Sequence, residues 1–206
     1  MQQSLNPWIT SEAGPDNASE KAPETYVPPP AVISAPLRGM VEPDTADRLP
    51  RRTMTGPATL WITGAHGGAG ENTIAGLLDG ARATGHGWPV LDDDQRKPAV
   101  LLVCRSDTRG LKAAQSALIQ WASGAAPAVD LLGLAVLADA PGKLPKALKE
   151  FAFLVGGGAP RLWILPWVEA WRHGDVTADM PSREYQRFAT DLISLTNQPP
   201  TTPQQH

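Results

Sequence analysis

The chain has 206 residues, 19% of them charged, and a formal net charge of -3. This length suits one ordinary domain with tails, and the slightly acidic balance excludes the basic footprint of direct nucleic-acid binding. The single cysteine, Cys104, excludes an internal disulfide and a cysteine metal cluster. No stretch approaches the roughly 20 apolar residues of a membrane span, and no secretory pattern opens the chain, so we expect a cytoplasmic protein.

The N-terminal part, residues 1–57, is rich in proline, and its sparse apolar residues follow no period. Such a segment cannot bury enough apolar surface to offset the entropy lost on ordering. We therefore expect a disordered Pro-rich region over residues 1–57, one folded domain over 58–196, and a disordered tail over 197–206.

The folded domain opens with the apolar run Thr59–Thr63 and the glycine-rich loop Gly64–Gly70. A helical pattern follows, because apolar residues recur at helical spacing at Ile74, Leu77, Leu78 and Ala81. A strand, a glycine loop and a helix N-terminus together form a cradle whose backbone N–H groups can approach a phosphate closely. The expected phosphate- or nucleotide-binding residues in this segment are Gly67, Gly68, Gly70, Asn72 and Thr73.

The loop departs from the P-loop pattern G-x-x-x-x-G-K-[ST], because Ala65 replaces the first glycine and Glu71 replaces the lysine. Losing the lysine contact costs roughly 1.5–3 kcal/mol. A carboxylate about 4 Å from a phosphate adds repulsion of up to about 4 kcal/mol at an effective dielectric of ~20. If Glu71 points into the loop, nucleotide affinity falls by roughly four decades. If it points to solvent, it stabilises its own helix through the helix dipole. We expect a loop that does not hydrolyse ATP.

Three further apolar runs, each followed by a helical pattern, predict strands at 99–104, 131–137 and 161–165. The connector Gly85–Pro98 is too short for another strand–helix unit. The fold class is therefore α/β, with a parallel sheet of about four strands and helices on both faces. Ligands bind such sheets at the carboxyl ends of the strands. Four loops should converge there: His66–Gly70, Arg105–Arg109, Ala138–Lys143 and Pro166–Trp171.

Two kinds of side chain on these loops point to binding. Arg105 and Arg109 follow the second predicted strand and could clamp a phosphate in place of the missing lysine. Trp167 and Trp171 follow the last strand and could form an aromatic docking surface for a protein. Core and loop packing is the alternative for both indoles. No metal-ligand spacing accompanies these residues, and we assign no catalytic residue.

The segment Thr59–Trp171 resembles the ParA/MinD branch of P-loop ATPases, whose deviant motif reads K-G-G-x-G-K-[ST]-[ST]. His66–Thr73 keeps the glycines and the last threonine but lacks both lysines. The resemblance implies a P-loop-NTPase-like fold, ATP with magnesium as the ligand, and a homodimer. The chain is also similar to a group of actinobacterial proteins whose genes lie near plasmid and mobile-element genes. That likeness rests on G-A-H-G-G-A-G, R-G-L-x-A-A-Q, L-x-D-A-P-G-x-L-P and P-W-V-E-A-W-R.

Two functions follow from these observations. The first is a non-hydrolysing ParA/MinD-like pseudo-ATPase that acts, with a protein partner, as a positioning or assembly adaptor in DNA segregation or transfer. The alternative is a nucleotide- or phosphate-binding protein that uses rewired arginines at the glycine loop. An unrelated enzyme with acid–base groups on the converging loops is a third option, and no motif for a nucleophile supports it.

Overall fold

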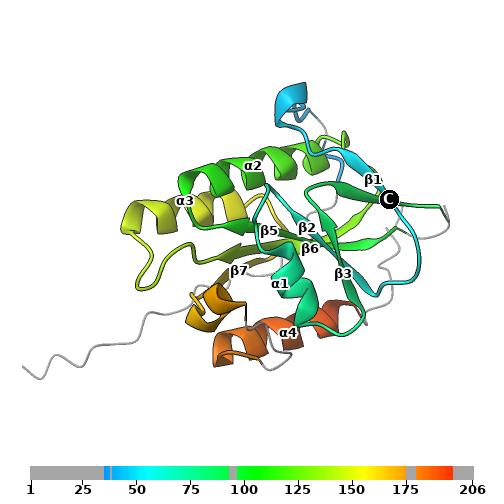
Figure 1. Cartoon of the computed structure of the whole chain (residues 1–206). Coiled ribbons are helices and arrows are strands. Elements are labelled where there is room, and N and C mark those ends of the chain that lie inside the picture. Colours follow the sequence, from blue (N-terminus) through cyan, green and yellow to red (C-terminus); the bar gives the residue numbers. More distant parts are fainter. Residues whose placement is uncertain (1–34, 38, 93–96, 175–179, 197–206) are drawn as a thin grey trace, which may run out of the picture.

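The computed structural model describes residues 35–37, 39–92, 97–174 and 180–196 (Figure 1). Their main feature is a five-stranded, fully parallel sheet with helices on both faces, which confirms the predicted α/β class. The predicted disorder of residues 1–34 and 197–206 lies outside the described residues. The strands of this sheet are β2 (Leu60–Gly64), β3 (Ala81–Gly85), β5 (Ala99–Arg105), β6 (Asp130–Leu137) and β7 (Leu162–Leu165).

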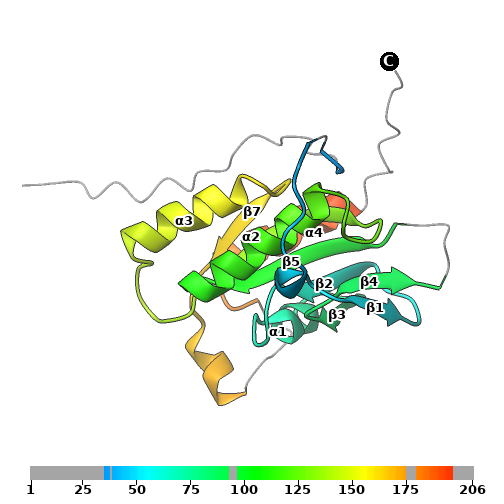
Figure 2. The ribbon, with the colours of Figure 1, turned by 90° about the horizontal axis from the view of Figure 1, so that it is seen from above.

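Alternating side chains along the buried strands create two apolar layers. Val100, Leu102 and Cys104 face one side of the sheet, whereas Leu101 and Val103 face the other. The first layer is covered by α2 (Thr108–Ala122) and α3 (Lys146–Gly156), which lie side by side in Figure 2. The second is covered by α1 (Glu71–Gly76) and α4 (Arg183–Thr196). No helix within the described ranges is long and apolar enough to cross a membrane.

The strand order of the sheet is β3-β2-β5-β6-β7. The chain leaves β2 toward one edge to form β3, and then returns to form β5 on the other side of β2. Counted within this sheet, the order is 2-1-3-4-5, which is that of flavodoxin-like doubly wound sheets. The strand order therefore reverses between β2 and β5. Ligands of such sheets bind at this point, outside the carboxyl ends of the strands.

The structure corrects the predicted number of strands. The sequence predicts about four, but β3 forms a fifth by pairing with β2. The sequence predicts a helical pattern that reaches Ala81, whereas α1 ends at Gly76. After α1 the chain turns back at Gly80, whose φ is 74° and whose carbonyl accepts from the Thr59 N–H at 2.9 Å. This return places Ala81 in a strand.

A second correction concerns a small parallel sheet made by β1 (Arg51–Met54) and β4 (Trp88–Leu91). The sequence predicts disorder over residues 1–57, which contain β1, and a connector without a strand over residues 85–98, which contain β4. Short 3-10 helices also form at Thr45–Asp47 and Glu169–His173.

Gln120 of α2 joins the N-terminal segment to the domain. Its Oε1 accepts from the Leu49 N–H at 2.9 Å and from the Trp88 Nε1–H at 3.0 Å. Its Nε2 donates to the Leu49 carbonyl at 3.1 Å. All three residues are buried, so one polar side chain ties the start of β1 and the start of β4 to a helix.

Candidate functional site

The glycine loop lies at the carboxyl end of β2, beside β5, where the strand order of the sheet reverses. Gly68 and Gly70 have φ angles of 78° and 102°, in the region that favours glycine. A Cβ at Gly70 would also lie 2.8 Å from Leu137 Cδ2. By contrast, a Cβ at Gly67 would meet nothing within 4 Å. The loop is thus held tightly against β6 at one end and open to solvent at Gly67.

Glu71, at the lysine position of the motif, turns its carboxylate into the loop. The residue is only 8% exposed, and its Oε2 accepts from the Gly70 N–H at 3.1 Å. A Cβ at Gly64 would lie 2.9 Å from the same oxygen, so this carboxylate requires the glycine at the end of β2. Of the two predicted orientations, the structure has the inward one. The loop therefore holds an anion that belongs to the protein itself.

The next two motif residues do not extend this arrangement. Asn72 is exposed and Thr73 is half-buried, both in the first turn of α1. No hydrogen bond of either side chain joins them to another described residue. The structure therefore places both residues in the predicted segment without bringing them into the contacts that shape the loop.

His66 joins the glycine loop to the end of β5. Its Nε2 accepts from the Arg105 N–H at 3.1 Å, and its Nδ1 lies 3.0 Å from the Gly67 carbonyl. A backbone N–H only donates and a carbonyl only accepts, so these contacts require a neutral imidazole with its proton on Nδ1. A Cβ at Gly110 would lie 2.9 Å from Nε2, so α2 begins close against this ring. Both nitrogens of His66 thus have structural partners.

Arg105 and Arg109, the predicted phosphate clamp, differ in their contacts. Arg105 Nε donates to the Gly68 carbonyl at 3.3 Å and Nη1 donates to the Ala138 carbonyl at 3.1 Å. This side chain therefore ties together the loops that follow β2 and β6, and its Nη2 makes no hydrogen bond to a described residue. Arg109 is exposed in the first turn of α2 and makes no hydrogen bond or ion pair within the described ranges.

The carboxyl ends of the strands enclose an open hollow of about 380 Å³. As predicted, residues from all four loops converge on it. Two guanidinium groups and two carboxylates lie around it, together with one indole. The residues that line the hollow are His66, Gly67, Gly68, Arg105, Asp107, Arg109, Asp139 and Trp167.

Sequence reasoning missed how the acidic residues of the hollow are held. Asp107 caps α2, because its Oδ1 accepts from the Gly110 N–H at 2.6 Å. Ser106 is buried, and its Oγ accepts from the Asp139 N–H at 3.0 Å. This contact fixes the start of the loop after β6. The sequence contains a signal for the cap, an Asp just before a helical pattern. The serine contact joins segments that are distant in sequence, so no local pattern predicts it.

The structure separates the two predicted docking tryptophans. Trp167 borders the hollow, where its Nε1 donates to Glu169 Oε2 at 2.7 Å and the Arg172 guanidinium lies 5.8 Å from its ring. Trp171 does not line the hollow. It packs edge-on against Tyr185 with ring centroids 5.1 Å apart, as part of the apolar layer beneath α4. Only Trp167 is therefore placed to contact a molecule in the hollow.

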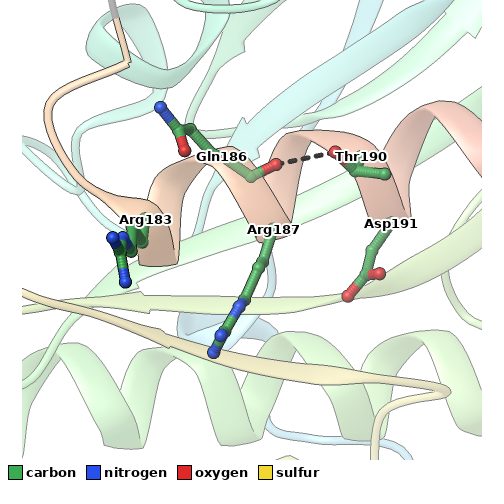
Figure 3. A pocket seen from close by; sticks show the side chains of 5 residues that line it. All are labelled: Arg183, Gln186, Arg187, Thr190 and Asp191. Carbon is green, nitrogen blue, oxygen red and sulfur yellow. Dashed lines mark hydrogen bonds between the residues drawn. The ribbon is translucent and has the colours of Figure 1, made fainter.

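A second hollow, of about 320 Å³, lies along α4 (Figure 3). All of its lining residues belong to one helix: Arg183, Gln186, Arg187, Thr190 and Asp191. Asp191 also accepts from Trp163 Nε1 at 3.2 Å, which fastens the helix to β7. Because its lining comes from a single helix, whereas residues from four loops line the hollow at the carboxyl ends, we regard the carboxyl-end hollow as the candidate site.

Comparisons with known proteins identify a family but no activity. The model of a family of unknown function (DUF6668) matches residues 58–186, which is more than half of the chain. The chain therefore belongs to this family. No curated protein and no solved structure matches it.

Proposed function

We propose that this member of DUF6668 is a non-hydrolysing, ParA/MinD-like pseudo-ATPase that acts as a positioning or assembly adaptor in DNA segregation or transfer. The single observation that carries the pseudo-ATPase part is the position of Glu71. Its buried carboxylate accepts from the Gly70 N–H inside the loop that would otherwise receive phosphate. The adaptor role rests on the resemblance to ParA/MinD proteins.

The charges make the loop a poor nucleotide site. The missing lysine removes roughly 1.5–3 kcal/mol of binding energy. With Glu71 turned inward, repulsion of up to about 4 kcal/mol at about 4 Å also applies, at an effective dielectric of ~20. Together these effects correspond to roughly four decades of affinity. A site with a micromolar dissociation constant for nucleotide would then have one above millimolar, which is too weak to support a cycle of hydrolysis.

The adaptor hypothesis rests on the loops at the carboxyl ends of the strands. The loops at the carboxyl ends are braced by His66 and Arg105, so they present a preformed surface. Trp167 lies on that surface, and Trp and Arg dominate protein–protein hot spots. We therefore place the docking surface for a protein partner on this rim of the sheet.

The alternative is a nucleotide or phosphate site built on the two arginines. One observation favours it: Arg109 and the Nη2 group of Arg105 border the hollow without a hydrogen bond to another described residue. Against it, Arg105 already holds two loop carbonyls, and acidic Asp107 and Asp139 line the same hollow.

Isothermal titration calorimetry with ATP and magnesium tests the proposal, using the full chain and three variants. Glu71→Lys restores the motif, Glu71→Gln removes only the charge, and Glu150→Lys makes the same charge change on the exposed surface of α3. We expect no heat from the wild type or Glu150→Lys, and saturable binding by Glu71→Lys. Saturable micromolar binding by the wild type would overturn the pseudo-ATPase proposal. If Arg105→Ala or Arg109→Ala then abolished that binding, the arginine alternative would replace it.

A further inference from the structure

The hollow at the carboxyl ends carries cations with unused donors. Arg109 and the Nη2 group of Arg105 lack a hydrogen bond to any described residue, and both residues line the hollow. The neighbouring backbone at Gly67 and Gly68 is exposed. A planar guanidinium matches a carboxylate or a phosphate with paired N–H groups. The hollow is therefore built to receive an anionic group, and the surrounding charges decide which one.

Acidic residues around the site work against a highly charged anion. Asp107 and Asp139 line the hollow, and Glu71 lies buried inside the adjoining glycine loop. The charge of Asp107 is offset by its cap on α2, but Asp139 is exposed. A phosphate carries close to two negative charges at neutral pH, whereas a carboxylate carries one. Each additional charge is repelled by these acidic groups, so the field of the hollow favours a single negative charge.

The shape of the hollow indicates where this group comes from. Small-molecule sites enclose most of the ligand surface, whereas Gly67, Gly68, Arg109 and Asp139 are all exposed here. An open, braced rim beside Trp167 fits a side chain presented by another protein. We propose that the hollow receives one carboxylate side chain of a protein partner, held by Arg109 and Arg105. This inference rests on the adaptor function proposed above and names the chemistry of its partner.

The test is a titration of the ¹⁵N-labelled full chain with three capped hexapeptides, followed by NMR. The peptides are identical except for one central residue: glutamate, glutamine or phosphoserine. We expect the glutamate peptide to shift the amide signals of Gly67 and Gly68 saturably, and the other two to bind at least about tenfold more weakly. Arg109→Gln should weaken the glutamate peptide by about 10- to 100-fold, the range for a lost hydrogen bond between charged groups. Lys112→Gln, on the next turn of α2 and outside the hollow, is the matched control and should change nothing.

Three results would overturn the inference. Equal binding of the glutamine peptide would show that the charge is not recognised. Tighter binding of the phosphoserine peptide would make the hollow a phosphate site. If no peptide shifted these signals at millimolar concentration, the two arginines would not bind a carboxylate side chain. The calorimetric experiment separates this failure from that of the proposed function, because ATP binding by the wild type overturns the latter whatever the peptides do.

Discussion

The contacts of Gln120 predict that replacing this one polar residue, far from the glycine loop, strongly lowers the free energy of unfolding. Gln120→Met keeps the length of the side chain but removes three hydrogen bonds, two to the backbone of Leu49 and one to the Trp88 indole. At about 1 kcal/mol net for each bond, the loss is about 3 kcal/mol. The backbone groups of Leu49 and the Trp88 indole N–H are buried, so leaving them without partners lowers the free energy of unfolding further. This is a large part of the roughly 5–15 kcal/mol that stabilises a typical domain.

Urea unfolding followed by circular dichroism measures this loss, and trypsin reports where it acts. If Gln120 anchors the N-terminal segment, the variant should be cut faster at Arg51 or Arg52, which lie on β1. Gln115→Met, on the exposed side of the same helix, is the matched control. A Gln120→Met variant within about 0.5 kcal/mol of the wild type, with unchanged cleavage, would show that the three bonds do not order this segment.

Two further substitutions test a close contact in the glycine loop and the burial of the cysteine thiol. Gly70→Ala should lower the free energy of unfolding by about 1–3 kcal/mol, because the new Cβ would meet Leu137 at 2.8 Å and φ is 102°; Gly67→Ala is the control, and equal effects in urea unfolding would contradict the loop geometry. Burial raises the pKa of the Cys104 thiol to about 12, so the unfolded chain loses this proton first as the pH rises above its ordinary value near 9. Stability should therefore fall between pH 9 and pH 12, and less steeply in Cys104→Ala; parallel curves of unfolding free energy against pH would contradict this account.

Long apolar runs made most of the sheet predictable. β5 and β6 are buried on both faces, and their near-continuous apolar sequence is typical of central parallel strands. The strand β3 lacks this signal, because Ala81–Gly85 contains small and polar residues and lies at the edge of the sheet. The pair β1 and β4 is joined to the domain by contacts of Leu49 and Trp88 with Gln120, which is polar and distant in sequence from both. Contacts of this kind leave no periodic pattern to read.

Parallel topology made the location of the candidate site predictable as well, because it gathers the carboxyl ends of the strands at one edge. Glu71 shows why the chemistry of the site could not be predicted in the same way. A glutamate in the first turn of a helix stabilises the helix dipole whether it faces solvent or the loop. The absence of a side chain at Gly64 permits the inward orientation, since a Cβ there would lie 2.9 Å from Oε2. The glycine at the end of β2 thus provides the space that the Glu71 carboxylate occupies.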